Sequence, residues 1–416
     1  MLGAHYLQAQ HKSEIGLGWA GNSINTVVFR KNSVVTYQNT QYVSYYDSSG
    51  YVILAKRILG SDQWNVKRTS YKGNIKDAHN SISIMVDGDG FLHMAWDHHA
   101  SKLRYCKSIA PNSLELTEEL PMVEKNELNV TYPEFYKIKN GDLLFLYRDG
   151  ASGRGNLILN RYNLKNKTWQ RIQDNLIDGE GSRNAYWQAC VDNTGVFHVS
   201  WVWRESSDVA TNHDMCYARS DDGGESWYTS TKKKYSMPIN LNQAERIVDI
   251  PQKSELINST AMTTDLAGNP YIVTYWRSPG TDIPQYHMIY FDGTIWRVQQ
   301  VSNRTTPFTL SGVGTKRIPI SRPQIMTDGK NAYVVFRDAE RGNKVSLYAC
   351  KNLHEPHWQV VDLSNESVGQ WEPSFDTELW QTKKELHLYV QNSGQADGEG
   401  TENKPPQMVS ILEWKK

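Results

Sequence analysis

The sequence predicts an all-β protein, a seven-bladed β-propeller with four antiparallel strands in each blade. The main observation is an internal repeat in which a turn is followed by tryptophan. It recurs at Trp64, Trp169, Trp227, Trp296, Trp358 and Trp414. The first interval is about twice the others, so one copy without tryptophan fits between Trp64 and Trp169, near Leu114. Seven units of this length, each rich in strand signals, are typical of a propeller.

A second repeated pattern supports the same fold. Each unit contains a strand that closes on an aromatic residue and a polar cluster, at 43–47, 94–98, 145–149, 201–205, 274–278, 335–338 and 388–391. The composition, with 23 Tyr, 14 Trp and 29 Gly, also favours strands and turns. No stretch has a convincing amphipathic helical pattern. We place the blades at 20–70, 77–120, 130–172, 183–232, 257–302, 320–362 and 370–416, in a single domain.

Bulk properties narrow the possible partners. Lys+Arg and Asp+Glu balance at 45 each, so no net basic field supports binding to nucleic acid or to a membrane surface. No run approaches the roughly 20 apolar residues of a membrane span. The N-terminus lacks the pattern of a signal peptide, so the protein is either cytosolic or begins after a removed signal. The four cysteines are too sparse for a disulfide framework. We expect a monomer.

Within the second unit, the sequence predicts a hairpin that gathers histidines. Residues 81–86 alternate like a half-buried strand, 87–90 form a turn, and 91–96 return. Because the strands are antiparallel, His79 should lie beside His98 and His99, with Asp77 and Asp97 near them. The hairpin alone fits either a site or a buried structural histidine beside an ordinary polar turn.

The same argument places the starts of first strands and the ends of second strands on one face of the ring. That face collects Arg, His, Tyr, Trp and Asn, which suit an anionic, hydroxyl-rich ligand. The alternative, favoured for Arg204, Arg277 and Arg337, is that strand-end arginines pair with neighbouring acids and fasten the blades. The candidate substrate-binding residues are Asn80, His98, Arg154, Tyr186, Trp187, Arg204, Arg277 and Arg322.

The second and third units supply the densest patch. Tyr132 begins a first strand, and Arg148 ends the matching second strand. Adjacent blades therefore bring His79, His99, Tyr132 and Arg148 together. The following loop, 151–155, is bracketed by glycines, which would let its backbone approach a ligand or leave it an ordinary surface turn.

One turn, Ser220-Asp221-Asp222-Gly223-Gly224-Glu225-Ser226-Trp227, fits the Asp-box pattern S-x-D-x-G-x-[ST]-W. Its aspartate is expected to cap the turn and its tryptophan to pack between blades, so we interpret it as scaffold.

Several motifs together resemble the BNR-repeat propeller family that contains the ulvan lyases. They are Asp-Ala-His-Asn-Ser at 77–81, Trp-Asp-His-His at 96–99, Thr-Tyr-Pro-Glu-Phe at 131–135 and Tyr-Arg-Asp-Gly-Ala-Ser-Gly at 147–153. The resemblance implies a polysaccharide lyase acting on a sulfated rhamnose–uronic acid polymer. Its catalytic group maps onto His79, His99, Tyr132 and Arg148, with His98 as an alternative to His99.

The implied reaction removes the C5 proton of a uronate and expels the group at C4. Arg148, with His99 beside it, would neutralise the carboxylate, and no cofactor or metal is needed. His79 suits the general base and Tyr132 the general acid, although Tyr132 becomes the base if nearby charges depress its pKa. The polymer's size implies secretion or a periplasmic location.

The sequence also fits other functions. An α-L-rhamnosidase would use the same scaffold as a hydrolase, and a lectin-like propeller would bind the polymer without cleaving it. A sialidase fits less well because only one good Asp-box is present. A structural zinc would need four ligands, for which the candidates are Cys190, His198, His213 and Cys216, in spacings that match no strong motif.

Overall fold

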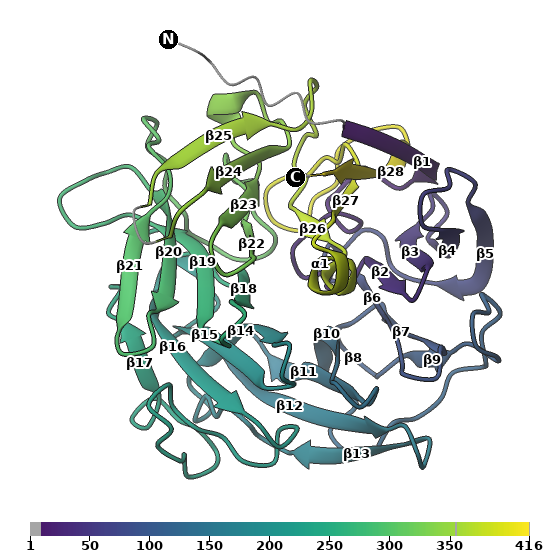
Figure 1. Ribbon diagram of the computed structural model, residues 1–416, viewed down its shortest axis with the longest axis horizontal. Coiled ribbons are helices and arrows are strands. Elements are labelled where there is room, and N and C mark those ends of the chain that lie inside the picture. The colour runs from purple at the N-terminus through teal and green to yellow at the C-terminus, as the bar shows by residue number, and fades with distance from the viewer. Residues whose placement is uncertain (1–9, 354–355, 416) are drawn as a thin grey trace.

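The computed structural model describes residues 10–353 and 356–415. Seven antiparallel sheets stand in a ring, with the inner strand of each sheet next to the centre (Figure 1). The predicted seven-bladed β-propeller is therefore confirmed. Strand alternation produces it, because each blade presents apolar faces to the blades on both sides.

The blades follow one another along the chain, each starting at its inner strand. The first three contain β2 (Val34–Tyr37), β3 (Thr40–Tyr46), β4 (Tyr51–Ile58) and β5 (Asn65–Lys72); β6 (Ile82–Val86), β7 (Leu92–Trp96) and β9 (Tyr105–Lys107); and β10 (Val130–Lys137), β11 (Leu143–Ala151), β12 (Arg154–Asn163) and β13 (Thr168–Gln173). In the second blade, an isolated bridge between Ser108 and Leu116 lies where a fourth strand would run.

The remaining blades keep the same order. They contain β14 (Asn184–Val191), β15 (Phe197–Arg204), β16 (Asn212–Ser220) and β17 (Glu245–Val248); β18 (Ala261–Thr264), β19 (Pro270–Trp276), β20 (Gln285–Phe291) and β21 (Trp296–Gln300); and β22 (Gln324–Thr327), β23 (Ala332–Phe336), β24 (Ser346–Cys350) and β25 (Trp358–Asp362). Short 3-10 turns occur at Val209–Thr211 and Ala339–Arg341.

The seventh blade is built from both ends of the described chain. Its inner strands are β26 (Ser374–Phe375), β27 (Leu386–Val390) and β28 (Gln407–Trp414), and its outer strand is β1 (Gln10–Gly18). β1 pairs antiparallel with β28 from Gln10 opposite Trp414 to Gly18 opposite Gln407. The sequence did not predict this closure, because β1 lies ahead of the first expected unit at residue 20.

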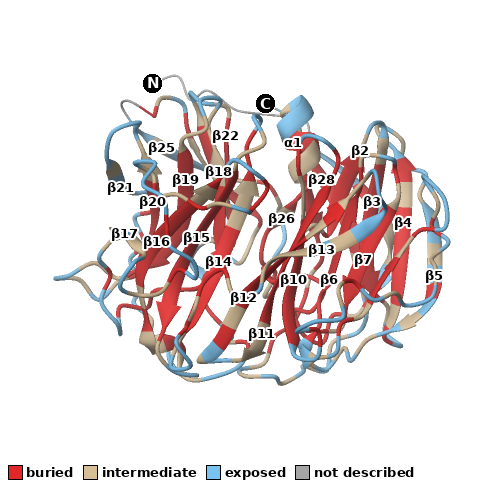
Figure 2. Ribbon diagram, turned by 90° about the horizontal axis from the view of Figure 1, so that it is seen from below, coloured by how far each residue is buried: buried red, intermediate tan, exposed pale blue. Residues whose placement is uncertain are grey.

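The core consists of the faces between blades. Figure 2 shows buried residues along most inner strands and exposed residues in the connecting loops. Among the largest fully buried side chains are Trp96, Trp201, Trp203, Trp227 and Trp371. The Asp-box turn works as expected from the sequence: Asp222 accepts a hydrogen bond from the Ser226 amide at 2.9 Å. All four cysteines are free.

A short helix, α1 (Thr377–Lys383), lies near the centre of the ring (Figure 1). Asp376 caps it by accepting the Leu379 amide. The helix helps to line a central cavity of about 100 Å³ together with the last residues of inner strands, such as Lys137 and Val191. Among the described residues, no helix is long and apolar enough to cross a membrane.

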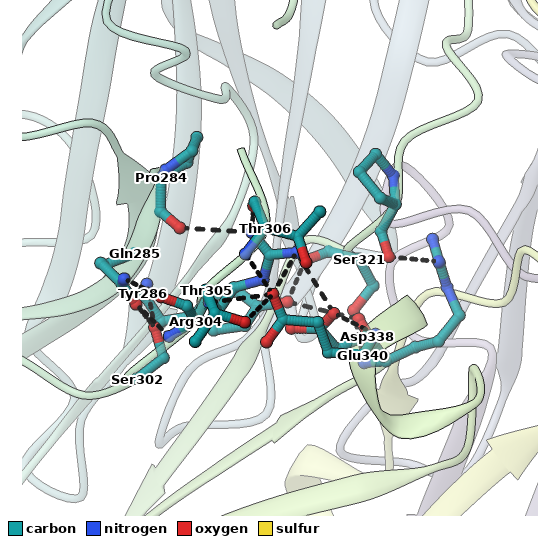
Figure 3. A network of polar contacts seen from close by, with 12 residues as sticks. Pro284, Gln285, Tyr286, Ser302, Arg304, Thr305, Thr306, Ser321, Asp338 and Glu340 are labelled. Atoms are coloured by element: carbon teal, nitrogen blue, oxygen red, sulfur yellow. Dashed lines mark hydrogen bonds and ion pairs between the residues drawn. The ribbon is translucent and has the colours of Figure 1, made fainter. Parts of the chain in front are cut away.

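Buried polar contacts fasten neighbouring blades at the ends of their strands. Arg304 donates to Asp338 at 2.7 Å, and both side chains are almost completely buried (Figure 3). Arg337 was expected to pair with Asp338. It instead donates to the backbone oxygens of Ile318, Pro319 and Trp371, because Arg304 occupies the carboxylate.

Candidate active site

His79 and His99 come together at the starts of the second and third blades. His79 precedes β6, and His99 begins β8 (His99–Ser101), a short strand that pairs with β10. Their rings stack with centroids 4.1 Å apart. Asp77 joins them: its two oxygens lie 3.0 Å from His79 Nδ1 and 2.6 Å from His99 Nδ1. The antiparallel hairpin thus brings His79, His99 and Asp77 together as the sequence predicted, whereas Asp97 pairs with Arg104 at 2.7 Å.

The electrostatics of this group favour a charged imidazole. Burial alone would lower the pKa of His79, but hydrogen bonds to Asp77 and Glu399 raise it to about 9. Burial alone would raise the pKa of Asp77, yet its hydrogen bonds to His79 and His99 hold it well below its usual range. At neutral pH, His79 is therefore protonated and Asp77 ionised.

His98 points elsewhere. Its side chain is fully buried, and its Nε2 accepts the Arg104 amide at 2.8 Å. Burial, with the nearby charge of Arg104, lowers its pKa to about 3. His99 is the one placed beside His79, because it begins β8, which leaves the second blade and pairs with β10.

Tyr132 sits in a β-bulge at the start of β10. The register with β11 shifts between Thr131 and Glu134, and Tyr132 has a φ of 58°. A bulky residue in this left-handed region is strained, and such strain is typical of functional sites. The bulge directs the ring onto Phe29, at 4.8 Å between centroids, and toward His79 at 5.8 Å.

Arg148, at the end of β11, closes the other side of the patch. Its guanidinium carbon lies 5.0 Å from the centre of the Tyr132 ring. It donates to Thr131 Oγ1 at 3.1 Å and approaches the Tyr186 hydroxyl at 3.5 Å. Its buried Nε has no partner among the described residues. The guanidinium thus has unused hydrogen-bonding capacity, which an anionic ligand would satisfy.

The two tyrosines of the site differ in their electrostatics. Burial and the neighbouring Tyr186 raise the pKa of Tyr132, and the nearby arginines oppose this only in part. Burial would also raise the pKa of Tyr186, but Arg204 and Arg148 lower it to about 8. Ser152 lies 3.0 Å from the Tyr186 hydroxyl. Tyr132 therefore keeps its proton, whereas Tyr186 is close to losing it.

The predicted arginines have different positions. Arg204 extends the patch, with its guanidinium 5.1 Å from the centre of the Tyr186 ring. The guanidinium carbon of Arg322 lies 4.9 Å from the ring centre of Phe29, the residue that stacks on His79. The same guanidinium pairs with Glu372 at 3.0 Å. Arg277 is paired with Glu255 at 2.7 Å and makes no described contact with the patch. Of the arginines for which fastening was favoured, Arg277 thus pairs with an acid, whereas Arg204 donates to the Ser207 carbonyl. Arg322, predicted to bind substrate, is held by an acid as well.

The other predicted binding residues serve mainly in the fold. Asn80 is buried and donates to the Asn74 carbonyl at 3.1 Å. Trp187 is buried and donates to Glu134 at 2.9 Å. Arg154 is exposed where β12 begins, at the tip of the hairpin.

Two residues at the site were not predicted. Phe29 lies in the segment before β2 and stacks on His79, with the two ring centroids 5.1 Å apart. Glu399, in the loop between β27 and β28, places Oε1 3.1 Å from His79 Nδ1. Neither follows a strand signal, so only the packing of the first and last blades against the second could have indicated them.

The Asp77, His79 and His99 cluster is the one group of potential metal ligands among the described residues. The nearly parallel rings, 17° apart, do not suit a shared ion. An imidazole binds a metal close to its own ring plane, and two rings stacked 4.1 Å apart direct their ring planes past one another. The residues foreseen for zinc have other partners: His198 contacts Tyr217 and Asp192, and His213 contacts Asp214 and Glu205.

Comparisons with known proteins agree with this architecture. Residues 40–304 match the BNR repeat-containing family. The short-isoform ulvan lyase of Alteromonas sp. (strain LOR) is 26% identical, with 69% of this chain and 66% of that protein covered. The long-isoform ulvan lyase of Glaciecola sp. (strain KUL10) is 22% identical over 73% of this chain. The match spans 36% of the length of that long isoform.

Solved structures show the same fold. The polysaccharide lyase Uly1 superposes with a TM-score of 0.72 at 15% identity, covering 98% of this chain and 100% of that one. A PL25 ulvan lyase bound to a GlcA(1-4)Rha3S repeat gives 0.71 at 13% identity, covering 97% and 96%. Because the family match extends over more than half of the sequence, the chain belongs to the BNR repeat-containing family.

Proposed function

We propose that the protein is a polysaccharide lyase that cleaves an ulvan-like polymer at a rhamnose–uronate linkage by β-elimination. The observation that carries the proposal is the patch itself: two histidines joined by Asp77, a strained tyrosine and a buried arginine, drawn from adjacent blades. The named activity of the similar proteins supports the same reaction class.

The arrangement can supply each part of an elimination. Arg148, with its unpartnered Nε, binds the uronate carboxylate and stabilises the charge that develops when the C5 proton leaves. His99 assists it from the partly exposed side of the cluster. His79 removes the C5 proton, and Tyr132, which keeps its own proton, gives one to the leaving oxygen at C4. Tyr186 and Arg204 bind the neighbouring sugar.

The proposed base must be neutral to act. Asp77 and Glu399 both hydrogen-bond to His79 Nδ1, which makes its other nitrogen a stronger base but keeps the ring protonated until the pH approaches 9. We therefore expect turnover to rise with pH across the neutral range. No cofactor enters this scheme. We further propose a monomer that acts outside the cytoplasm, because the polymer is too large to cross a membrane.

The proposal is tested by ultraviolet absorbance during incubation with ulvan, because elimination creates a conjugated C4=C5 double bond. We expect absorbance to rise with the wild-type protein. His79→Ala and Arg148→Ala should each reduce the rate by about 100-fold or more, the usual contribution of acid–base and charge-stabilising groups.

Matched controls come from the rim of the ring. His11→Ala removes an exposed histidine that pairs with Asp62, and Arg68→Ala removes an exposed arginine that pairs with Asp47. Both should retain wild-type rates. Release of free rhamnose without an absorbance change would replace the lyase by a hydrolase. Binding of ulvan with neither product would leave a carbohydrate-binding propeller.

A further inference from the structure

We propose that Glu399 is a positioning residue: a carboxylate carried from the seventh blade that fixes the orientation and charge of the His79 imidazole in the second. The inference deepens the proposed function and takes its catalytic meaning from it. It concerns a residue that no repeat, motif or strand signal indicates, and a loop that reaches across the ring.

The contact is made by one well-fixed oxygen. Glu399 Oε1 lies 3.1 Å from His79 Nδ1 and accepts the Thr315 backbone N–H at 2.9 Å. Asp77 Oδ1 lies 3.0 Å from the same imidazole nitrogen. A proton on Nδ1 is therefore shared between two carboxylates, which directs the other ring nitrogen away from both of them.

The loop that carries Glu399 is anchored to two other segments and braced by a bond of its own. Gln395 is buried and accepts the Ser23 hydroxyl at 2.7 Å. Its amide nitrogen donates at 3.0 Å to the Gly398 carbonyl, directly before Glu399. Asp397 pairs with Lys316 at 2.7 Å. These contacts fix the position of Glu399, since each holds a residue within four sequence positions of it.

Among the groups around His79, the carboxylates of Asp77 and Glu399 are the ones that stabilise its positive charge. Around the ring are His99, stacked at 4.1 Å, Tyr132 at 5.8 Å, which stays neutral, and the apolar ring of Phe29 at 5.1 Å. Burial lowers the pKa of His79, and the hydrogen bonds and charges of Asp77 and Glu399 together raise it to about 9. Without Glu399, burial would be opposed by Asp77 alone.

A carboxylate beside a site for an anionic polymer would repel the substrate if it stood alone. Here the His79 imidazolium offsets one of the two carboxylate charges, of Asp77 and Glu399, that contact it. The same contact strengthens His79 as a base once the proton is lost. Glu399 therefore links the pH range in which His79 can act as a base to the position of a loop on the seventh blade.

Nuclear magnetic resonance of histidine side chains tests this without any substrate. The protein is labelled on histidine, and His79→Gln identifies the His79 signals. We expect the wild-type imidazole to titrate near pH 9 and Glu399→Gln to lower that midpoint by about 1 to 2 pH units, the usual effect of removing one close opposite charge. Glu115→Gln is the matched control: it makes the same substitution at an exposed glutamate of the second blade, which pairs with Lys67, and should leave the midpoint unchanged.

An unchanged His79 midpoint in Glu399→Gln would overturn the proposal, as would an equal shift in Glu115→Gln. Far-ultraviolet circular dichroism checks that both variants fold, and Glu399→Asp provides a second variant that retains the charge and should keep most of the elevated midpoint. The pH profile of kcat/KM with ulvan forms a separate arm, in which Glu399→Gln should move the limb to lower pH by the same amount. Failure of wild-type turnover would reject the lyase while the titration still decides the role of Glu399.

Discussion

At the scale of single residues, the site is defined by which hydroxyls and rings carry charge. Tyr132 and Tyr186 lie with ring centroids 6.0 Å apart, yet they differ in proton affinity. Tyr186 stands between Arg148 and Arg204, which favour the phenolate, whereas burial dominates at Tyr132. Two residues of the same type thus provide a proton donor and a group ready to carry negative charge.

This difference predicts a pH-dependent stability. The pKa of Tyr186 is about 8 in the folded protein and about 10 when unfolded, so the unfolded state holds its proton longer. The free energy of unfolding should therefore gain about 2 to 3 kcal/mol from Tyr186 as the pH rises from 8 to 10, and lose it as the pH falls again. Urea denaturation of wild-type protein and Tyr186→Phe at several pH values measures the gain.

Only the wild type should show this additional rise. Parallel pH dependences for the two proteins would mean that Tyr186 is not shifted. Ser152→Ala serves as a milder comparison, since it removes a hydrogen bond to the phenol while leaving both arginines in place.

The sequence predicted the residues of this site to the extent that strand geometry places them. His79 and His99 follow from an antiparallel hairpin, and Tyr132 with Arg148 from the next one. His98 against His99 could not be resolved, because the choice depends on β8 leaving its own blade to pair with β10. Glu399 could not be predicted, because it lies in a loop and the sequence of a loop has no periodicity from which its conformation follows.

At the scale of elements, the hairpin of β11 and β12 holds Arg148 in place. The loop was expected from its glycines to let backbone approach a ligand. In the structure, Gly155 serves Arg148 instead: a Cβ at Gly155 would lie 2.6 Å from Arg148 Cγ and 3.1 Å from Asn184 Oδ1. The guanidinium reaches the patch because this strand position has no side chain.

Gly155→Ala should therefore impair the site without altering any group that touches substrate. The added methyl must displace the Arg148 stem, and small displacements of a charge-stabilising group commonly cost about 100-fold in rate. We expect a loss in kcat/KM with ulvan and near-normal folding by circular dichroism. Gly153→Ala, at the half-buried tip of the same hairpin, is the comparison for general loop strain.

Normal turnover in Gly155→Ala would show that Arg148 has room to adjust. A loss shared equally with Gly153→Ala would point to hairpin strain, because Gly153 has a φ of 79° that favours glycine. The comparison therefore distinguishes a glycine that makes room for Arg148 from a glycine that the turn of the hairpin requires.

At the scale of the whole molecule, the ring depends on a strand that the repeat count omits. The seven units were recognised from their turns and tryptophans, which mark positions within a blade. The repeat has no signal for how the ring closes, and by its spacing Trp414 ends the last unit. In the structure it lies on β28, the third strand of its blade, and β1 supplies the fourth.

Closure requires glycine where β1 passes between blades. A Cβ at Gly18 would lie 2.9 Å from Val409 Cγ2 and 3.1 Å from Tyr45 Cδ2. Gly18→Val should destabilise the protein by about 1 to 3 kcal/mol, the usual cost of overpacking, although valine suits a strand. Chemical denaturation measures the change, and Leu17→Val, at an exposed neighbouring position, should have little effect.

An unchanged midpoint for Gly18→Val would mean that β1 packs loosely on the last blade. A loss of cooperativity, with one blade melting before the others, would show that closure holds the ring together without stabilising each sheet.

The pairing of β1 with β28 also has a consequence for synthesis on the ribosome. Of the strands of the propeller, β1 is made first and its partner β28 last. Until then, β1 has no strand to pair with, and unpaired strand edges invite association with other chains. The propeller must therefore stay an open ring until β28 has been made, and that strand converts a row of stacked sheets into a closed circle.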